Sequence, residues 1–398
     1  MHLSAIQAEL RARHLDGWLF YDHHHRDPIA YRVLGLPAQM ATRRWYYLIP
    51  AEGAPRKLVH RIEAGALDPL PGERRVYARW GELEAGLRGL VAELGAAPRL
   101  AMQYSPGCAL PAISLADAGT VETMRQLGCL VLSSGDLISR FDATWTAAML
   151  ANHRLAGRGV DAAIAGAFAW VRQELEGGRR LDEYRLQRWL VEQMQAGGLE
   201  VEEPPIVAVN AHAGDPHYQP PEQGSAPIAP GDLLLLDVWA KAPGAESAYY
   251  DVTWMGYCAR PGEGAVPEEY AQAFAVARAA RDAGIACVAE RLAAGQKLRG
   301  YEVDRAVRGV IAAAGLGEYF VHRTGHSLGR EVHATGANLD DFETHDEREI
   351  LVGSGFTIEP GIYCPQGKPY GVRTEVNLYV GEGGAEVTGP RQQEIVRI

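Results

Sequence analysis

The sequence predicts an α+β protein with a smaller N-terminal α/β part and a larger C-terminal part. The chain has 398 residues, which is long for a single hydrophobic core. Helix-like and strand-like segments alternate over the N-terminal part. In the C-terminal part, two helices followed by strands occur twice over. We therefore expect two domains, residues 1–145 and 146–398.

The N-terminal part begins with an amphipathic helix over Leu3 to Arg13, followed by a strand over Gly17 to Tyr21. A second helical pattern covers Glu82 to Leu94. Further strands are expected at Arg44 to Ile49, Arg56 to His60, Arg99 to Gln103 and Cys129 to Leu132. Such alternation is typical of a small α/β domain with a mixed sheet.

The C-terminal part begins with an Ala-rich helical segment that runs to about Leu175. A second helix is expected from an Asp182 N-cap to about Ala196, where two glycines end it. Strands follow at Pro204 to Val209 and Leu233 to Trp239, with a returning hairpin strand at Tyr249 to Cys258. The pattern then repeats with a long helix that has Pro267 at its first position, a helix over Glu302 to Ala314, and strands through Val380.

Composition and charge argue against several classes of protein. The net charge of −11 disfavours a nucleic-acid partner, because such proteins usually carry a basic face. No stretch approaches the roughly 18 apolar residues that span a bilayer, and the first residues lack a secretory-signal pattern. The five cysteines are scattered without a C-x-x-C pair. We expect a cytoplasmic protein with reduced, mostly buried thiols and no membrane partner.

Five side chains of the C-terminal part lie in or beside short apolar runs and predict a metal site: Asp237, Asp251, His326, Glu359 and Glu375. Burying four carboxylates near one another is costly unless cations neutralise them. Two divalent ions carry the matching four positive charges, and one neutral histidine adds a ligand without changing that balance. This oxygen-rich set suits Mn²⁺ or Co²⁺ better than structural zinc.

Local patterns indicate how these ligands meet. Pro243-Gly244 is a turn signal between Asp237 and Asp251, so a hairpin would bring both carboxylates to the same end. Arg373 and Glu375 lie two apart in a strand pattern and would share a face, where the guanidinium braces a ligand carboxylate. Water that bridges two metal ions has a lowered pKa, and the ions polarise a carbonyl, so such a site suits amide hydrolysis.

A series of short motifs carries a resemblance to a known family. The motifs are Pro216-His217-Tyr218, the two aspartates, His322-x-x-x-His326-Ser327-Leu328-Gly329-x-x-x-His333, Thr357-x-Glu359-Pro360-Gly361-x-Tyr363, and Arg373-x-Glu375. Each is weak alone, but together and in this order they are specific. From about residue 150 to its end, the chain resembles the pita-bread (M24) metallopeptidases, which include creatinase, Xaa-Pro dipeptidase (prolidase) and aminopeptidase P. The N-terminal part resembles the creatinase/prolidase N-terminal domain less distinctly.

The resemblance implies roles for these residues. Asp237 and Asp251 would hold one metal ion and bridge to the second, which His326 and Glu359 would complete, with Glu375 bridging. Family members use Mn²⁺, Co²⁺, Fe²⁺ or Zn²⁺, and Mn²⁺ is expected here. Glu359 would also shuttle a proton from the nucleophilic water. His217, His322 and His333 would position the substrate and stabilise the oxyanion, and Arg373 would fix the carboxylate network or the substrate.

The implied activity is hydrolysis of the Xaa-Pro bond, in dipeptides or at peptide N-termini, through a hydroxide that bridges the two metal ions. Tyr218 and Trp239 are candidates for the wall of a pocket that accepts the proline ring. A homodimer is expected by the same likeness. Alternative functions on this fold are a metal-dependent lyase, another hydrolase of small C–N substrates, and a catalytically inactive binding homologue.

Some positions depart from the family pattern. Val238 and Trp239 follow the first aspartate in place of a small residue and glycine, and Trp254 stands where arginine is usual. Ala334 follows His333 in place of an acid, and Val376 follows Glu375 where many members carry a polar group. These differences leave the predicted ligands intact but alter the walls of the pocket, so they bear on the substrate more than on the metal.

The run His23-His24-His25 is interpreted as a solvated loop, because consecutive histidines do not easily face one ion. An alternative is that this loop reaches the active site of a partner subunit, since the family often dimerises with N-terminal domains near the neighbouring cleft.

Overall fold

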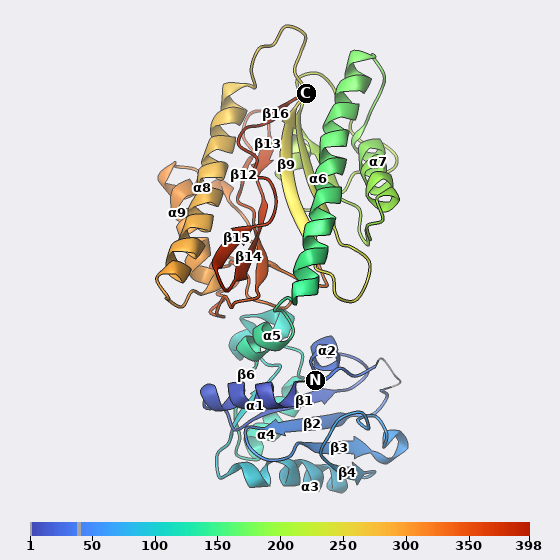
Figure 1. Cartoon of the computed structure of the whole chain (residues 1–398), viewed down its shortest axis with the longest axis vertical. Helices are drawn as coiled ribbons and strands as arrows, with labels where there is room; N and C mark the ends of the chain where they lie inside the picture. Colours follow the sequence, from blue (N-terminus) through green and yellow to red (C-terminus); the bar gives the residue numbers. More distant parts are fainter. Residues whose placement is uncertain (1, 38–40) are drawn as a thin grey trace. The chain divides into compact units, whose positions relative to one another are not determined.

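The computed structural model describes residues 2–37 and 41–398, while Met1 and residues 38–40, which belong to the predicted N-terminal domain, lie outside that description. The chain divides into two compact units, Met1–Asp142 and Ala143–Ile398. Figure 1 shows the helices and strands of each unit in the order of the chain. Trp145 belongs to the second unit, where its indole N–H donates to the carbonyl of Leu328 at 2.8 Å.

The N-terminal unit is built on a six-stranded mixed sheet in the order β4-β3-β2-β1-β5-β6. Its strands are β1 (Gly17–Asp22), β2 (Trp45–Pro50), β3 (Arg56–His60), β4 (Glu73–Tyr77), β5 (Arg99–Met102) and β6 (Leu130–Ser133). Its helices are α1 (Leu3–Ala12), α2 (Pro28–Leu34), α3 (Trp80–Val91), α4 (Ala118–Gln126) and α5 (Gly135–Phe141). The predicted α/β domain with a mixed sheet is confirmed.

Alternating side chains of the central strand bury against helices on both faces of this sheet. Trp18 and Phe20 of β1 pack with α1, α2 and α5 on one face. Leu19 and Tyr21 point to the other face, where α3 and α4 cover the sheet. Because successive strand residues face opposite sides, one buried strand anchors both layers.

Four elements of this unit were not predicted from the sequence, namely α2, β4, α4 and α5. Strand β4 reads Glu-Arg-Arg-Val-Tyr, and its first four residues are exposed at the edge of the sheet. A charged edge strand lacks the apolar alternation on which strand prediction rests. Helix α2 had a detectable signal, because Asp27 caps it by accepting from the Ala30 N–H at 2.9 Å and Pro28 follows.

The C-terminal unit contains the predicted series of two helices and strands, twice over. The helices are α6 (Ala147–Glu176), α7 (Glu183–Ala196), α8 (Glu268–Ala293) and α9 (Gly300–Ala313). The first half adds β7 (Ile206–Val209), β8 (Leu233–Ala240) and β9 (Tyr250–Tyr257), which form the sheet β16-β9-β8-β7 with β16 (Val396–Arg397). The second half adds β10 (Ser327–Leu328), β11 (Gly355–Ile358), β14 (Val376–Gly381) and β15 (Gly384–Val387) in the sheet β10-β11-β14-β15, and the hairpin of β12 (Gly361–Cys364) and β13 (Tyr370–Arg373).

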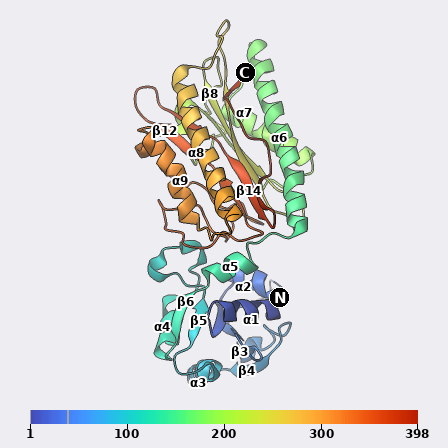
Figure 2. The same cartoon turned by 60° about the vertical axis from the view of Figure 1, so that its left-hand side comes forward.

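Strand β8 has helices on both of its faces. Leu234 and Leu236 pack with α6 and α7. Leu233 and Leu235 pack on the opposite side in a core that includes α8 and α9. Figure 2 shows the strands between α6 and α8. The near-continuous apolar run of β8 is therefore explained by burial on both faces.

Two local predictions about this unit were wrong. Pro267 is the N-cap of α8 and not its first helical residue, since its ψ of 137° is extended. The strand expected to hold both Arg373 and Glu375 is broken between them: β13 ends at Arg373, and β14 of another sheet begins at Val376. The shared face of a single strand therefore does not explain how those two side chains meet.

All five cysteines are free. Cys129 and Cys258 are buried and Cys287 and Cys364 are partly buried, but Cys108 is exposed, unlike the mostly buried thiols that were expected. Within residues 2–37 and 41–398, no helix is both long and apolar enough to cross a membrane. The His23-His24-His25 loop is partly to fully exposed, and His24 and His25 have positive φ angles of 63° and 54°.

Candidate metal centre

One cavity of about 810 Å³ in the C-terminal unit is lined by all nine side chains that the sequence singled out. They are His217, Asp237, Asp251, His322, His326, His333, Glu359, Arg373 and Glu375. These residues come from both halves of the unit and span 159 positions of sequence, from 217 to 375. Two sheets, β16-β9-β8-β7 and β10-β11-β14-β15, position the five proposed metal ligands in this cavity.

The β8–β9 hairpin positions the two aspartates. Its antiparallel register pairs Asp237 with Thr253 and Trp239 with Asp251. All four side chains therefore share one face of the sheet, which is the face of Leu233 and Leu235. The predicted hairpin is confirmed, with the carboxylates diagonal to one another across the two strands.

The second sheet positions the other three acid and imidazole groups. Glu359 directly follows β11 and Glu375 directly precedes β14, and these antiparallel strands end with Ile358 opposite Val376. His326 directly precedes β10, which pairs with β11. The backbone at His326 is fixed against β11, because the Thr357 N–H donates to the carbonyl of His326 at 2.9 Å.

Gly325, just before His326, lies where the two backbones are closest. A Cβ at this position would overlap the carbonyl oxygen of Thr357. Gly325 also forms a bridge with Leu339 on its other side. Only glycine allows the segment that carries His326 to approach β11 this closely.

The ligand atoms of this group converge. His326 Nε2 lies 3.5 Å from Asp251 Oδ2 and 3.4 Å from Glu359 Oε1. Asp251, His326 and Glu375 each offer one atom, and these three atoms all lie within 4.8 Å of one another. A cluster of oxygen atoms with one imidazole nitrogen matches the donors that Mn²⁺ and related divalent ions prefer.

Two carboxylate oxygens here are buried without a partner. Asp237 Oδ1 and Asp251 Oδ1 accept no hydrogen bond from any described residue. Buried polar atoms are almost always hydrogen-bonded, so each such oxygen calls for an explanation. Cations between these carboxylates would supply it, and the residues present thus fit the metal ions that the sequence implies.

The electrostatics lead to the same conclusion. Burial, followed by the charge of Asp251 and the other acids, raises the pKa of Glu375 well above its usual range. Burial and Asp237 likewise raise the pKa of Asp251. Burial also raises the pKa of Glu359, and it lowers the pKa of His326. Without cations, like charges in a buried site resist ionisation, while the neutral imidazole keeps a free lone pair.

Arg373 links three neighbours of the cluster. Its Nη2 donates to Asp237 Oδ2 at 2.5 Å, its Nη1 to the Tyr363 hydroxyl at 3.1 Å, and its Nε to Thr253 Oγ1 at 3.0 Å. Thr253 in turn donates to Glu375 Oε2 at 2.8 Å. The guanidinium thus holds one carboxylate directly and a second through a hydroxyl group.

The three other histidines differ in how firmly they are held. His322 Nε2 lies 2.7 Å from the Tyr363 hydroxyl, and burial together with Arg373 lowers the pKa of His322 to about 3. The ring of His333 is exposed and lies edge-on to that of His326, with 4.3 Å between centroids. His217 is exposed at the cavity, and its backbone N–H donates to Asp215 Oδ1 at 3.0 Å.

Two of the aromatic assignments were wrong. Tyr218 does not line this cavity, because its hydroxyl donates to buried Glu183 at 2.7 Å and its ring stacks on His212. Trp254 lies on the opposite face of β9 and lines a separate cavity with Phe168. Trp239, which is paired directly with Asp251 in the hairpin register, does line the predicted site.

The side chains that hydrogen-bond to the proposed metal ligands had no predicted role. Thr357 donates to Glu359 Oε1 at 3.0 Å and accepts from the His326 N–H at 3.0 Å. Asn377 accepts from the Asp251 N–H at 3.0 Å. Thr357 and Tyr363 already stand in the motifs of the sequence, and Thr253 lies two residues from Asp251 in β9, so strand alternation would have found it.

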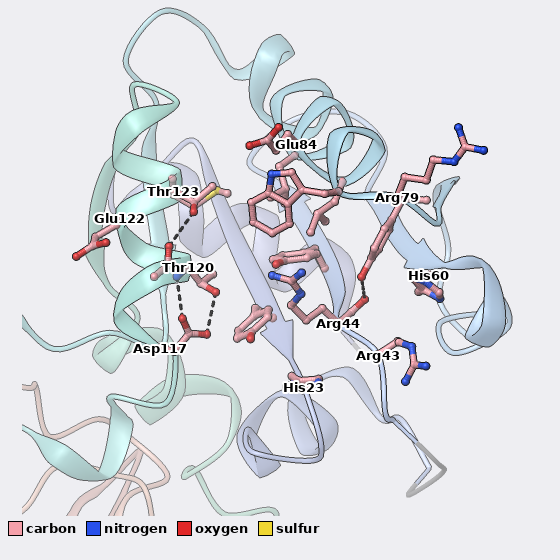
Figure 3. A pocket seen from close by; sticks show the side chains of 18 of the residues that line it. His23, Arg43, Arg44, His60, Arg79, Glu84, Asp117, Thr120, Glu122 and Thr123 are labelled. Carbon is pink, nitrogen blue, oxygen red and sulfur yellow. Dashed lines mark hydrogen bonds between the residues drawn. The ribbon is translucent and has the colours of Figure 1, made fainter.

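A second cavity, of about 840 Å³, lies within the N-terminal unit and is shown in Figure 3. It has aromatic walls, and the Arg44 guanidinium lies 5.6 Å from the centroid of the Trp80 ring. Among the acids that line it, Asp117 is held in place by two hydrogen bonds. It caps α4 by accepting from the N–H and hydroxyl of Thr120. Among the described residues, this unit holds no cluster of histidine, cysteine or acid ligand atoms like that of the first cavity.

Known proteins match this chain along its length. The profile of Metallopeptidase family M24 matches residues 151–382. Probable dipeptidase PepE of Mycobacterium bovis is 30% identical over 366 residues, which make up 89% of this chain and 85% of that protein. The crystal structure of dipeptidase PepE from Mycobacterium ulcerans matches at 24% identity with a TM-score of 0.70, covering 100% of this chain and 97% of that one.

An Xaa-Pro dipeptidase from Bacillus anthracis has the same fold, with a TM-score of 0.64 at 19% identity over 100% of this chain and 99% of that one. Family and fold, as the motifs predicted them, are confirmed. Membership implies a dinuclear divalent metal centre, and a buried group of aspartate, histidine and glutamate is present to hold one. The chain belongs to metallopeptidase family M24, with an N-terminal α/β domain and a C-terminal pita-bread catalytic domain.

Proposed function

We propose that this protein is a dinuclear metal-dependent dipeptidase that hydrolyses the bond between a first residue and proline. The observation that carries the proposal is the buried carboxylate cluster, in which Asp237 and Asp251 each keep one oxygen without a hydrogen bond from the described residues. The dipeptidase relatives support a dipeptide substrate. The alternative substrate preference is for longer peptides, from which the enzyme would remove the first residue before proline.

The two ions would be held by Asp237, Asp251, His326, Glu359 and Glu375. When bound, divalent ions lower the pKa of coordinated water and polarise the scissile carbonyl. Mn²⁺ is our first candidate, because four carboxylates and one imidazole make a hard donor set. The assignment rests on the donor chemistry and on the family.

Glu359 is the proposed proton carrier. Its side chain is 15% exposed, compared with 6% for the side chain of Asp251, and it lines the cavity where water and substrate would enter. The hydrogen bond from Thr357 leaves its second oxygen free of that contact. A carboxylate so placed can take a proton from water and deliver it to the departing nitrogen, which in an Xaa-Pro bond has no hydrogen of its own.

The histidines and Arg373 would act on the substrate and on the carboxylates. His322 is kept neutral by burial, so it carries a single N–H, which donates from Nδ1 to the carbonyl of Arg323. Its Nε2 would then accept from the Tyr363 hydroxyl, so His322 would fix that side chain at the site and would have no N–H left for the oxyanion. His333 and His217 lie at exposed positions of the same cavity, suited to positioning the substrate. Arg373 would fix Asp237 in place.

We also propose the domain boundaries, the compartment and the oligomeric state of the protein. The domains are residues 1–145 and 146–398, close to the two compact units. The protein acts in the cytoplasm, in keeping with its reduced cysteines. It forms a homodimer, as the family resemblance implies.

The test is an assay of metal-stripped protein reloaded with Mn²⁺, Co²⁺ or Zn²⁺. Xaa-Pro dipeptides, dipeptides without proline and longer Xaa-Pro peptides are offered separately, and the released amino acids are quantified. We expect metal-dependent cleavage of the Xaa-Pro dipeptides. Tight metal binding without cleavage of any peptide would contradict the proposal and favour a lyase or an inactive homologue.

A further inference from the structure

Arg323 lines the catalytic cavity with no partner for its charge. It lies one residue after His322 and three before His326, and its side chain is partly buried. Among the described residues, its guanidinium makes no hydrogen bond, ion pair or ring contact. A guanidinium that is partly desolvated and unpaired is costly, so a cavity that keeps one is suited to an anion that arrives from solution.

The backbone of Arg323 is fixed although its side chain is free. Its N–H donates to Glu343 Oε1 at 2.9 Å, and its carbonyl lies 2.7 Å from His322 Nδ1. The base of the side chain is therefore held beside the metal-binding segment, while the planar fork can adjust to a ligand. Arg323 lines the same cavity as His326 and the proposed carboxylate ligands.

Arg323 differs from the other charged residues of the cavity, which are one paired arginine and several acids. Arg373, the second arginine on the wall, already donates to Asp237, Tyr363 and Thr253. The remaining charged groups outside the proposed ligands are acids, namely Glu203, Asp215 and Glu343. A substrate carboxylate that enters this cavity is repelled by the acids and has one unpaired cation within the described lining to bind.

We infer that Arg323 binds the free C-terminal carboxylate of the substrate and so restricts the enzyme to dipeptides. Guanidinium and carboxylate match in a two-pronged hydrogen-bonded pair, which fixes orientation as well as charge. In a dipeptide that carboxylate belongs to the residue just after the scissile bond, whereas in a longer peptide an uncharged amide takes its place. The inference rests on the proposed function and deepens it, because it names the group that separates dipeptides from longer chains.

The experiment compares alanyl-proline with alanyl-prolinamide, which differ only in that carboxylate. For the metal-loaded wild type we expect kcat/KM to be about 10- to 100-fold higher for the free acid, the effect of one charged hydrogen-bonded pair. Arg323→Gln should lose about the same factor on the acid, through KM, and change little on the amide. Arg323→Lys, which keeps a charge without the fork, should fall in between.

Arg330→Gln is the matched control, since Arg330 is exposed and donates instead to the carbonyl of Ala245. It should leave the preference for acid over amide unchanged. Metal content and melting temperature of each variant show whether the centre and the fold persist. Equal rates of the wild type on both substrates, or an equal loss of both in Arg323→Gln, would overturn the inference.

The two proposals fail separately. If the wild type cleaves neither compound, the proposed Xaa-Pro activity is wrong, and calorimetry then measures how tightly the metal-loaded protein binds each compound. Tighter binding of the acid, lost in Arg323→Gln, still supports the carboxylate site. Equal binding of acid and amide overturns it. The wild-type comparison also stands alone if Arg323→Gln fails to fold.

Discussion

Two cavities among the described residues have similar volumes, about 840 Å³ in the N-terminal unit and about 810 Å³ in the C-terminal unit, but their charged side chains differ in burial and pairing. In the first, Asp117 is satisfied by Thr120, and Glu84 and Glu122 lie at exposed positions. In the second, carboxylates are buried against one another, and two of their oxygens accept no hydrogen bond from described residues.

The difference teaches that volume alone does not mark a site of chemistry. A stable fold normally pairs its buried polar atoms. An excess of buried charge therefore persists only where a bound ligand compensates the free-energy cost of burying it. The N-terminal cavity is explained by the capping and packing of its own residues. The C-terminal cavity is explained only with cations, which is why mutations in the two should have different consequences.

The largest expected effect is that of Glu359→Gln. The amide keeps the shape of the side chain but can no longer carry a proton, so turnover should fall by about 10³-fold or more. The fold should persist, because Thr357 can still donate to the amide oxygen. Steady-state kinetics with circular dichroism measures both. A fully active variant would remove Glu359 from the proposed role.

Removal of metal should destabilise the C-terminal unit. At a metal concentration about 100 times the Kd, binding stabilises a folded protein by about 2.7 kcal/mol, and a chelator removes that stabilisation. Calorimetric melting with and without chelator measures the difference. An identical unfolding curve in both conditions would mean that no ion occupies the cluster.

Metal-free protein should also show a particular dependence on pH. Burial raises the pKa of Asp251, Glu359 and Glu375, so these acids hold their protons more tightly in the folded than in the unfolded state. Their contribution to stability is complete below the usual carboxyl pKa of about 4 and is lost as the pH rises through the raised values. The melting temperature should fall over that range without metal and change less with metal. The reverse trend would contradict the assigned burial of charge.

Arg373→Lys tests the network around the cluster. Lysine keeps the charge near Asp237 but cannot reach Asp237, Tyr363 and Thr253 together. We expect metal affinity or kcat/KM to fall by about 10- to 100-fold. Arg154→Lys, at an exposed ion pair with Glu386, is the control and should leave both unchanged. Equal behaviour of the two variants would reduce Arg373 to an ordinary ion-pair partner.

The smallest effects should come from two helix caps, one in each unit. Asp117 caps α4 and Asp182 caps α7, each by accepting a backbone N–H at 2.9 Å. Replacing either by alanine should cost about 1 kcal/mol of stability and leave metal content unchanged. Denaturant unfolding and elemental analysis measure these quantities. A loss of activity in Asp117→Ala would show that the N-terminal cavity takes part in the chemistry.

Much of the candidate site was predictable because its residues lie in compact motifs at strand ends. Apolar runs located β8 and β9, and the turn between them predicted the hairpin that carries Asp237 and Asp251. Other features depend on pairing partners that local patterns do not contain. Trp254 follows Thr253 directly and therefore faces the opposite side, and the register of β9 decides which of the two reaches the cavity.

The unpredicted parts have equally physical reasons. The break between Arg373 and Glu375 is a change of sheet, which a continuous apolar pattern conceals. Whether Arg323 or Arg373 is paired depends on contacts between segments far apart in the chain, so two arginines of the same type receive different roles only in three dimensions. Edge strand β4 escaped prediction because three of its four exposed residues are charged.

Gly325 shows that an absent side chain can be as decisive as the residues proposed to bind the metal. Backbones from two separate segments touch at this point, so the reach of His326 toward the acids is set by a hydrogen atom where other residues have carbon. An engineer who transplanted the five proposed ligands to another scaffold, and left any larger residue at this position, would widen the gap and lose the cluster with all five residues still in the sequence.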